Sequence, residues 1–177
     1  GIPFIPQKGP VLSFRIYGDP LFRTYNDLDF LVDPENIPDA LRLVSEKGFR
    51  AVSYVFPENG YRQKLVMQHV NELYLRNPDP EVGIELHWTL FNGFPSGRMW
   101  LTELVQENTM NLRFEGRDYT VLNSELELLY LVIHGSLHGW SRLKWLVDVR
   151  ELLRRSEIDG LKFASLVQQF RAQNPVA

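Results

Sequence analysis

Three carboxylates in the first half of the chain, those of Asp27, Asp29 and Glu85, stand in a pattern that can hold a divalent cation. Residues 27–32 alternate between polar and apolar and end apolar, which predicts a strand. Because strand side chains alternate between faces, Asp27 and Asp29 project to the same side. Like charges this close are costly unless a cation lies between them, and oxygen ligands of this kind suit Mg²⁺ or Mn²⁺. An isolated Asp-x-Asp sequence is more often a pair of surface acids on a solvated strand edge. The residues around it must therefore show whether it binds a metal.

Glu85 lies in a second predicted strand, residues 82–88, where apolar side chains alternate with Gly83, Glu85 and His87. If the two strands are neighbours, three carboxylates converge, enough to hold one or two ions for phosphoryl transfer. Without metal, we expect these acids to repel one another. We also expect Asp29→Asn to keep the fold, because the position faces a cleft. Two alternatives stay open: a solvated acid at Glu85, and a packed histidine at His87.

Basic residues near the carboxylates indicate where phosphates could bind. Lys8-Gly9 precedes a predicted helix, and a glycine turn at a helix N-terminus favours an anion. Arg23 precedes Asp27 by four residues and could clamp a phosphate through paired hydrogen bonds, or instead form an ion pair with the acids. A Lys-Gly pair by itself is more often only a turn.

A second group of polar residues lies towards the C-terminus. His134 and His138 are four residues apart, so on a helix they share one face, a spacing that can bind zinc. Gly135 occupies the position of the glutamate in zinc-protease helices, and we expect no tightly held transition metal. Two interpretations stay open: histidines hydrogen-bonded between helices, or substrate contacts that also involve Arg142 and Asp148.

The periodicity predicts an α+β fold, a mixed sheet flanked by helices and followed by a small C-terminal helical lobe. We expect helices at about 9–17, 35–47, 124 onward for some four turns, 143–156 and 161–170, and strands at about 1–5, 27–32, 49–55, 69–76, 82–88, 110–114 and 118–122. Ser124 and Glu127 match a capping box. We therefore divide the chain into a core, residues 1–122, and a helical lobe, residues 123–177.

Composition narrows the class of protein. The 177 residues carry a formal charge of -3, which argues against a wide basic surface for long nucleic acids. There is no cysteine, so neither disulfides nor thiolate chemistry contribute. No apolar run in the sequence approaches the roughly 20 residues that span a bilayer. We expect a cytoplasmic protein that does not bind membranes.

These features in this order resemble the polymerase-beta-like nucleotidyltransferase superfamily, and most closely its uncharacterised nucleotidyltransferase family. The resemblance spans nearly the whole chain and rests on Lys8-Gly9, on Arg23 with residues 27–32, on residues 85–88 and on residues 134–148. The wider superfamily has Gly-Gly or Gly-Ser where this chain has Gly9-Pro10, and Pro10 removes one backbone donor from the phosphate cradle.

The resemblance implies transfer of a nucleoside monophosphate from a nucleoside triphosphate, such as ATP, to an acceptor with the help of two Mg²⁺ or Mn²⁺ ions. It assigns the metal to Asp27, Asp29 and Glu85, and gives Glu85 a further role as the base that activates the acceptor hydroxyl. Lys8, Gly9 and Arg23 would bind the nucleotide. A small molecule or a protein is favoured over long nucleic acid as the acceptor. The alternatives are a nucleotide-binding module without turnover and a hydrolase using His134 and His138.

Overall fold

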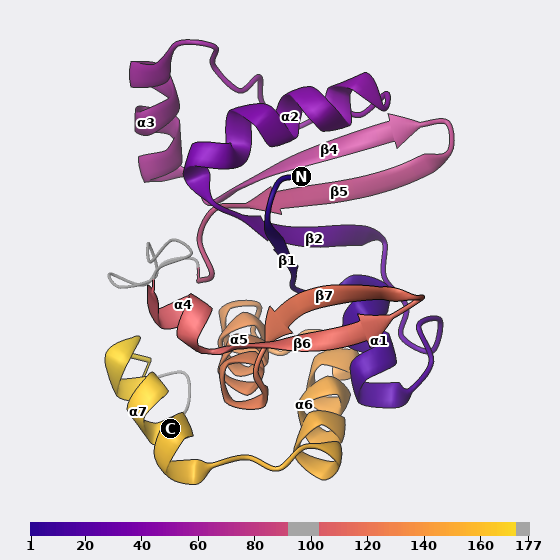
Figure 1. Ribbon diagram of the computed structural model, residues 1–177, viewed down its shortest axis with the longest axis vertical. Helices are drawn as coiled ribbons and strands as arrows, with labels where there is room; N and C mark the ends of the chain where they lie inside the picture. The colour runs from indigo at the N-terminus through magenta and orange to yellow at the C-terminus, as the bar shows by residue number, and fades with distance from the viewer. Residues whose placement is uncertain (92–102, 173–177) are drawn as a thin grey trace.

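The computed structural model describes residues 1–91 and 103–172, and its centre is a five-stranded mixed sheet (Figure 1). The strands are β1 (Phe4–Pro6), β2 (Asp27–Val32), β3 (Arg50–Ala51), β4 (Glu72–Pro78), β5 (Glu81–His87), β6 (Thr109–Phe114) and β7 (Arg117–Leu122). The helices are α1 (Gly9–Tyr17), a 3-10 turn η1 (Pro34–Asn36), α2 (Ile37–Glu46), α3 (Gly60–His69), α4 (Glu103–Glu107), α5 (Ser124–Leu137), α6 (Leu143–Arg155) and α7 (Gly160–Gln169). The predicted α+β class is confirmed.

The order of the strands brings the two acid-bearing segments together. The sheet runs β1-β2-β5-β4-β3, and β6 and β7 form a separate hairpin. Strands β2 and β5 are parallel, with Asp27 opposite Gly83 and Asp29 opposite Glu85. Strand β4 is antiparallel to β5 as predicted, and its first residue, Glu72, stands opposite His87. The register therefore places Asp29 and Glu85 side by side.

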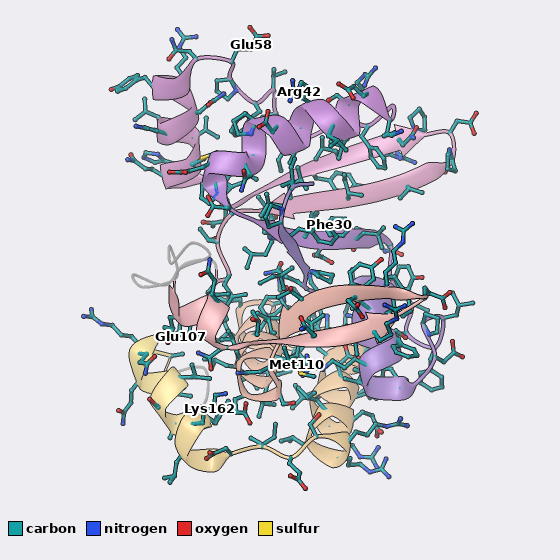
Figure 2. All side chains as sticks on the ribbon, viewed as in Figure 1. Phe30, Arg42, Glu58, Glu107, Met110 and Lys162 are labelled. Atoms are coloured by element: carbon teal, nitrogen blue, oxygen red, sulfur yellow. The ribbon has the colours of Figure 1, made fainter. Side chains whose placement is uncertain are left out.

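The two faces of this sheet have different coverings. Residues 28, 30, 32, 84, 86 and 88 face α2 and α3 and pack into one apolar cluster with them. Figure 1 shows α2 and α3 on that side, and α5, α6 and α7 with the β6-β7 hairpin on the other. Figure 2 labels Arg42 on the outer surface of α2, away from the sheet. Alternation along β2 and β5 consequently directs the acids towards the C-terminal helices.

The core on the acidic side is shared between the N-terminal and C-terminal parts of the chain. One cluster of buried side chains joins Ile16 of α1 and Leu31 of β2 to Leu129 of α5, Leu152 of α6 and Phe170 of α7. Arg15 of α1 also reaches α5, where its Nη1 lies 3.2 Å from a carboxylate oxygen of Glu127. The proposed division after residue 122 stays a prediction, and this cluster contains residues from both sides of it.

One predicted strand is shorter in the structure, and helices α3 and α4 were not predicted. The strand expected at 49–55 contains only β3, because the chain leaves the sheet edge after it, and Val52 and Val55 are 59% and 88% exposed. Helix α3 was not predicted, since its sequence has little apolar periodicity. The signal for its start is Asn59, whose side chain accepts hydrogen bonds from the backbone of Tyr61 and Arg62.

The N-cap of α5 also differs from the prediction, and it lies one residue earlier than the expected Ser124. Asn123 is the N-cap, and its side chain accepts a hydrogen bond from the backbone N–H of Leu126. Ser124 and Glu127 instead receive the guanidinium of Arg15. Ser124 and Glu127 thus take part in a tertiary contact and not in a capping box, while the predicted length of about four turns agrees with the 14 residues of α5. Within residues 1–91 and 103–172, no helix is long and apolar enough to cross a membrane.

We expect Gly135→Ala to destabilise the fold by about 1–2 kcal/mol, because overpacking outweighs the roughly 1 kcal/mol that alanine gains in helix propensity. The ring of Trp140 packs directly against Gly135, and an added Cβ would overlap it. Denaturant unfolding would measure the loss. The matched control is Gly60→Ala, where an added Cβ meets nothing within 4 Å. Equal stability of Gly135→Ala and the wild type would contradict this packing.

Glu127 should make stability depend on pH. Burial raises its pKa to about 7, an effect that Arg15 only partly offsets, and one of its carboxylate oxygens has no hydrogen-bond partner among the described residues. Since this pKa lies above the ordinary 4.5, the stabilisation is complete below about pH 4.5 and is lost as pH rises through about 7. Glu127→Gln should flatten the difference in unfolding free energy between about pH 5 and pH 8. The exposed Glu107→Gln should keep the wild-type profile, and an unchanged profile in Glu127→Gln would refute this origin.

Candidate active site

A cavity of about 360 Å³ opens between the acidic face of the sheet and helices α5 and α6. Its floor comes from Lys8 just before α1, from the loop before β2, and from β2, β4 and β5, and its wall from α5, α6 and the turn between them. The residues that border it are Lys8, Arg23, Tyr25, Asp27, Asp29, Glu72, Glu85, His87, Leu90, Phe91, Tyr130, Ile133, His134, Leu137, His138, Ser141, Arg142, Lys144 and Trp145. All three predicted carboxylates therefore face the same space.

Asp29 lies at the centre of the floor and is almost fully buried, with 2% of its side chain exposed. One of its carboxylate oxygens is 2.8 Å from Nζ of Lys8 and 3.3 Å from Nε2 of His87. The same imidazole lies 3.3 Å from Glu85 through Nε2 and 3.2 Å from Glu72 through Nδ1. A single histidine thus links three carboxylates, from three adjacent strands.

The charges on the floor stabilise one another. Burial alone would lower the pKa of His87, but its bonds to Asp29, Glu72 and Glu85 outweigh this and raise it to about 10. Burial likewise opposes the charge on Lys8, yet its contacts with Tyr130 and Asp29 raise its pKa. The pKa of Asp29 is lowered in spite of its burial, because His87 and Lys8 bind the carboxylate. The expected repulsion between the acids is therefore neutralised by two cations of the chain itself.

Asp29, Glu85 and His87 each offer a ligand atom, and these atoms all lie within 4.8 Å of one another. Two of the three were predicted as metal ligands. Asp27 is not one of this group, although it borders the same cavity two residues before Asp29 on the same strand face. The two carboxylates are hard oxygen ligands, which suit a divalent ion such as Mg²⁺ or Mn²⁺, whereas the protonated His87 would bind an ion only after losing its proton.

The two histidines of α5 form part of an aromatic wall. The ring of His134 is stacked 6.0 Å from that of Tyr130, lies tilted 4.6 Å from that of His138, and meets Trp145 edge-on at 5.2 Å. Burial, with the nearby cation of Lys8, lowers the pKa of His134 to about 3, so the ring is neutral. Both histidines border the cavity, as does Trp145, and His134 is also packed between aromatic rings of α5 and α6; their contact with substrate stays a prediction.

Arg23 forms an ion pair, but with a different acid from the one expected. Its Nε donates to Asp148 of α6 at 2.8 Å, and Tyr17 donates to the other oxygen of that carboxylate at 2.8 Å. Asp148 is fully buried behind Arg23 and does not border the cavity. The contact fastens the loop that precedes β2 to the C-terminal helices.

Of the remaining predicted site residues, four border the cavity and one does not. Lys8, Arg23, His87 and Arg142 border the cavity, whereas Gly9 packs against Leu28 at the start of α1, away from it. Sequence analysis missed five bordering polar residues: Tyr25, Glu72, Tyr130, Ser141 and Lys144. The predicted pairing of β4 with β5 is the signal that could have indicated Glu72. It was not sufficient, because the register that sets Glu72 opposite His87 was not predicted. No short motif marks Tyr130 or Lys144.

Comparisons with known proteins agree with this architecture. A family described as "Uncharacterised nucleotidyltransferase" matches residues 1–177. No curated protein sequence matches the chain. Among solved structures, the chain is similar to the lincosamide antibiotic adenylyltransferase LnuA in its lincomycin-bound form, with a TM-score of 0.57, 12% identity and 88% of each chain covered.

Two further structures are similar. ANT(2")-Ia in complex with adenylyl-2"-tobramycin gives a TM-score of 0.60 at 13% identity, covering 98% of this chain and 89% of that one. An antigenic nucleotidyltransferase-like protein from Paracoccidioides brasiliensis gives 0.52 at 16% identity, with coverages of 98% and 83%. At these identities the likeness establishes the fold.

Asp29→Asn should destabilise the metal-free protein, contrary to the expectation from sequence. The substitution leaves Lys8 and His87 as buried cations without their shared partner, and breaking such a buried pair costs about 3–5 kcal/mol. Denaturant unfolding in the presence of a chelator would measure it. Asp27→Asn is the control, because this side chain is only half-buried, and it should change stability by less than about 0.5 kcal/mol. Equal losses in the two variants would overturn the central position of Asp29.

Proposed function

Because the chain belongs to this family of uncharacterised nucleotidyltransferases, we propose that it transfers a nucleoside monophosphate from a nucleoside triphosphate to an acceptor hydroxyl, with Mg²⁺ or Mn²⁺ bound at the floor of the cavity. The observation that carries the proposal is the register of β2 and β5, which sets Asp29 beside Glu85 at the floor of a cavity. Asp27 faces the same space. This arrangement of acids on adjacent strands supports a metal-assisted phosphoryl transfer.

The residues present fit a divalent ion. The carboxylates of Asp29 and Glu85 already converge, with oxygen atoms within 4.8 Å of each other, and Asp27 adds a further carboxylate on the same face. Lys8 and the protonated His87 now supply the positive charge that this acid cluster requires. When bound, a divalent ion would neutralise phosphate charge and lower the pKa of the attacking hydroxyl. Asp27, Asp29 and Glu85 would hold it, as the resemblance implies.

Glu85 is the best candidate for the base that accepts the proton of the acceptor hydroxyl. Its side chain is 22% exposed, whereas that of Asp29 is 2% exposed and bound by two cations. His87 binds Glu85 and Asp29 through the same nitrogen, and so fixes how the two carboxylates lie relative to each other. We assign His87 and Lys8 to positioning and charge balance, and Glu85 to proton transfer.

The acceptor we propose is a small molecule, with a protein side chain as the alternative. A volume of about 360 Å³ lies within the range of small-molecule sites, and α5 lines it with aromatic and apolar side chains such as Tyr130, Ile133 and Leu137. LnuA was solved with lincomycin and ANT(2")-Ia with adenylyl-2"-tobramycin, both small molecules. The net charge of -3 does not favour a long nucleic acid.

A nucleotide-binding module without turnover is the second candidate, and one observation favours it. The amine of Lys8 is engaged by Asp29, and Pro10 removes a backbone donor from the neighbouring turn. A chain that binds Mg²⁺ and nucleoside triphosphate but labels nothing would support this function instead.

The test uses each nucleoside triphosphate labelled at the α-phosphate, with Mg²⁺ and a cell extract that supplies acceptors. We expect label to appear in a low-molecular-mass product and a chelator to abolish it. Asp27→Asn and Glu85→Gln should reduce the rate by about 10³-fold or more and change nucleotide affinity much less, because metal ligands and the base act mainly in the transition state.

Glu81→Gln provides the matched control for Glu85→Gln, since Glu81 lies on β5 with Glu85 but does not border the cavity. It should transfer label at the wild-type rate. Normal melting together with wild-type transfer in Asp27→Asn and Glu85→Gln would remove these acids from the reaction.

A further inference from the structure

Three cations of the cavity lie together around the start of α6, on the side facing the carboxylates. They are Arg23, Arg142 and Lys144, all of which border the cavity. We propose that these three residues form the site for the β- and γ-phosphates of the nucleoside triphosphate, an inference that rests on the proposed function. The triphosphate would then extend from the carboxylate floor to the helical wall.

The turn before α1 is poorly equipped for this task. Lys8 is only 14% exposed and its amine lies 2.8 Å from Asp29, so its charge serves the floor. Gly9 has a φ of +71° and packs against Leu28 without bordering the cavity. Pro10 has no N–H to offer. A triphosphate carries up to four negative charges, and the charge that would balance them must come from elsewhere in the cavity.

Arg23 is held with its fork towards the cavity. Its side chain is 4% exposed, and Asp148 binds only its Nε. The two terminal nitrogens donate to no residue within the described parts of the chain. A guanidinium fixed at one edge and open at the other is arranged to bind phosphate oxygens through two parallel hydrogen bonds. The terminal nitrogens border the cavity without a partner among the described residues, which points to an anionic ligand there.

Lys144 and Arg142 extend this group along the start of α6. The amine of Lys144 donates to the carbonyl of Thr24 at 3.1 Å, which holds it beside the loop that carries Arg23. Burial, and then Arg23 and Arg142, lower the pKa of Lys144, so the cations are close enough to repel one another. Arg142 lies over the ring of Trp145, at 5.9 Å from its centroid. Mutual repulsion of this kind is relieved when an anion binds.

The start of α6 adds a weaker contribution of the same sign. Arg142 is the N-cap residue, and no side chain caps the free backbone N–H groups of the first turn. Unfilled amides and the helix dipole both favour negative charge. Together with the buried guanidinium of Arg23, they give the wall both charge and directed hydrogen-bond donors.

The test measures binding of inorganic tripolyphosphate, MgATP and AMP to the full chain by calorimetry. Arg142→Ala and Lys144→Ala should each weaken tripolyphosphate and MgATP binding by about tenfold, and the double variant by about 100-fold, because each removes a charge-assisted contact. AMP binding should change less, since it lacks the β- and γ-phosphates. Arg142 is exposed and Lys144 is partly exposed, so the fold should survive, and thermal melting would check this.

Arg150→Ala, on the same helix but outside the cavity, controls for the loss of one positive charge and should bind like the wild type. If the wild type binds MgATP and the Arg142 and Lys144 variants bind it equally well, the inference is wrong while the proposed function stands. If the variants lose tripolyphosphate and MgATP binding as expected but the wild type transfers no label, the inference stands and the proposed function fails. If the wild type binds neither tripolyphosphate nor MgATP, both fail.

Discussion

The carboxylate of Asp29 binds Lys8 and His87 at 2.8 Å and 3.3 Å while being nearly withdrawn from solvent. A buried charge is tolerated only when it is paired and hydrogen-bonded, so this residue constrains its surroundings. Lys8 must reach it from the start of α1, and His87 must reach it from β5. His87 in turn binds Glu85 and Glu72, so one imidazole holds together the acids of three strands. These bonds thus fix the relative positions of the carboxylates that we propose as metal ligands.

Polar contacts also set where the opposite wall of the cavity lies. Asp148 of α6 receives both Arg23 and Tyr17, and Glu127 of α5 receives Arg15. Each of these bonds joins the C-terminal helices to α1 or to the loop after it. Because the partners are buried, moving either helix would leave a buried charge without its partner. The distance between carboxylates and aromatic wall is thus held by ion pairs as well as by the apolar core.

Local patterns were sufficient to predict much of the fold. The alternation in residues 27–32 and 82–88 identified both acid-bearing strands and the face on which the acids lie, and helical periodicity found α5, α6 and α7. Contacts distant in sequence were not accessible in the same way. The pairing of Arg23 with Asp148 spans 125 residues, and the pairing of Arg15 with Glu127 spans 112, which is why Glu127 was mistaken for part of a helix cap. The contribution of Glu72 depended on the register of β4, which alternation alone does not fix.

The central claim is that Asp29 and Glu85, in register on β2 and β5, form a divalent-metal site in the cavity. Electron paramagnetic resonance of Mn²⁺ tests it directly, because free Mn²⁺ gives a sharp signal that broadens when the ion binds protein. The account predicts stoichiometric Mn²⁺ binding by the wild type in the presence of a non-hydrolysable nucleoside triphosphate analogue, and its loss in Glu85→Gln. Glu81→Gln should bind Mn²⁺ as the wild type does. Undiminished Mn²⁺ binding by Glu85→Gln would contradict the claim.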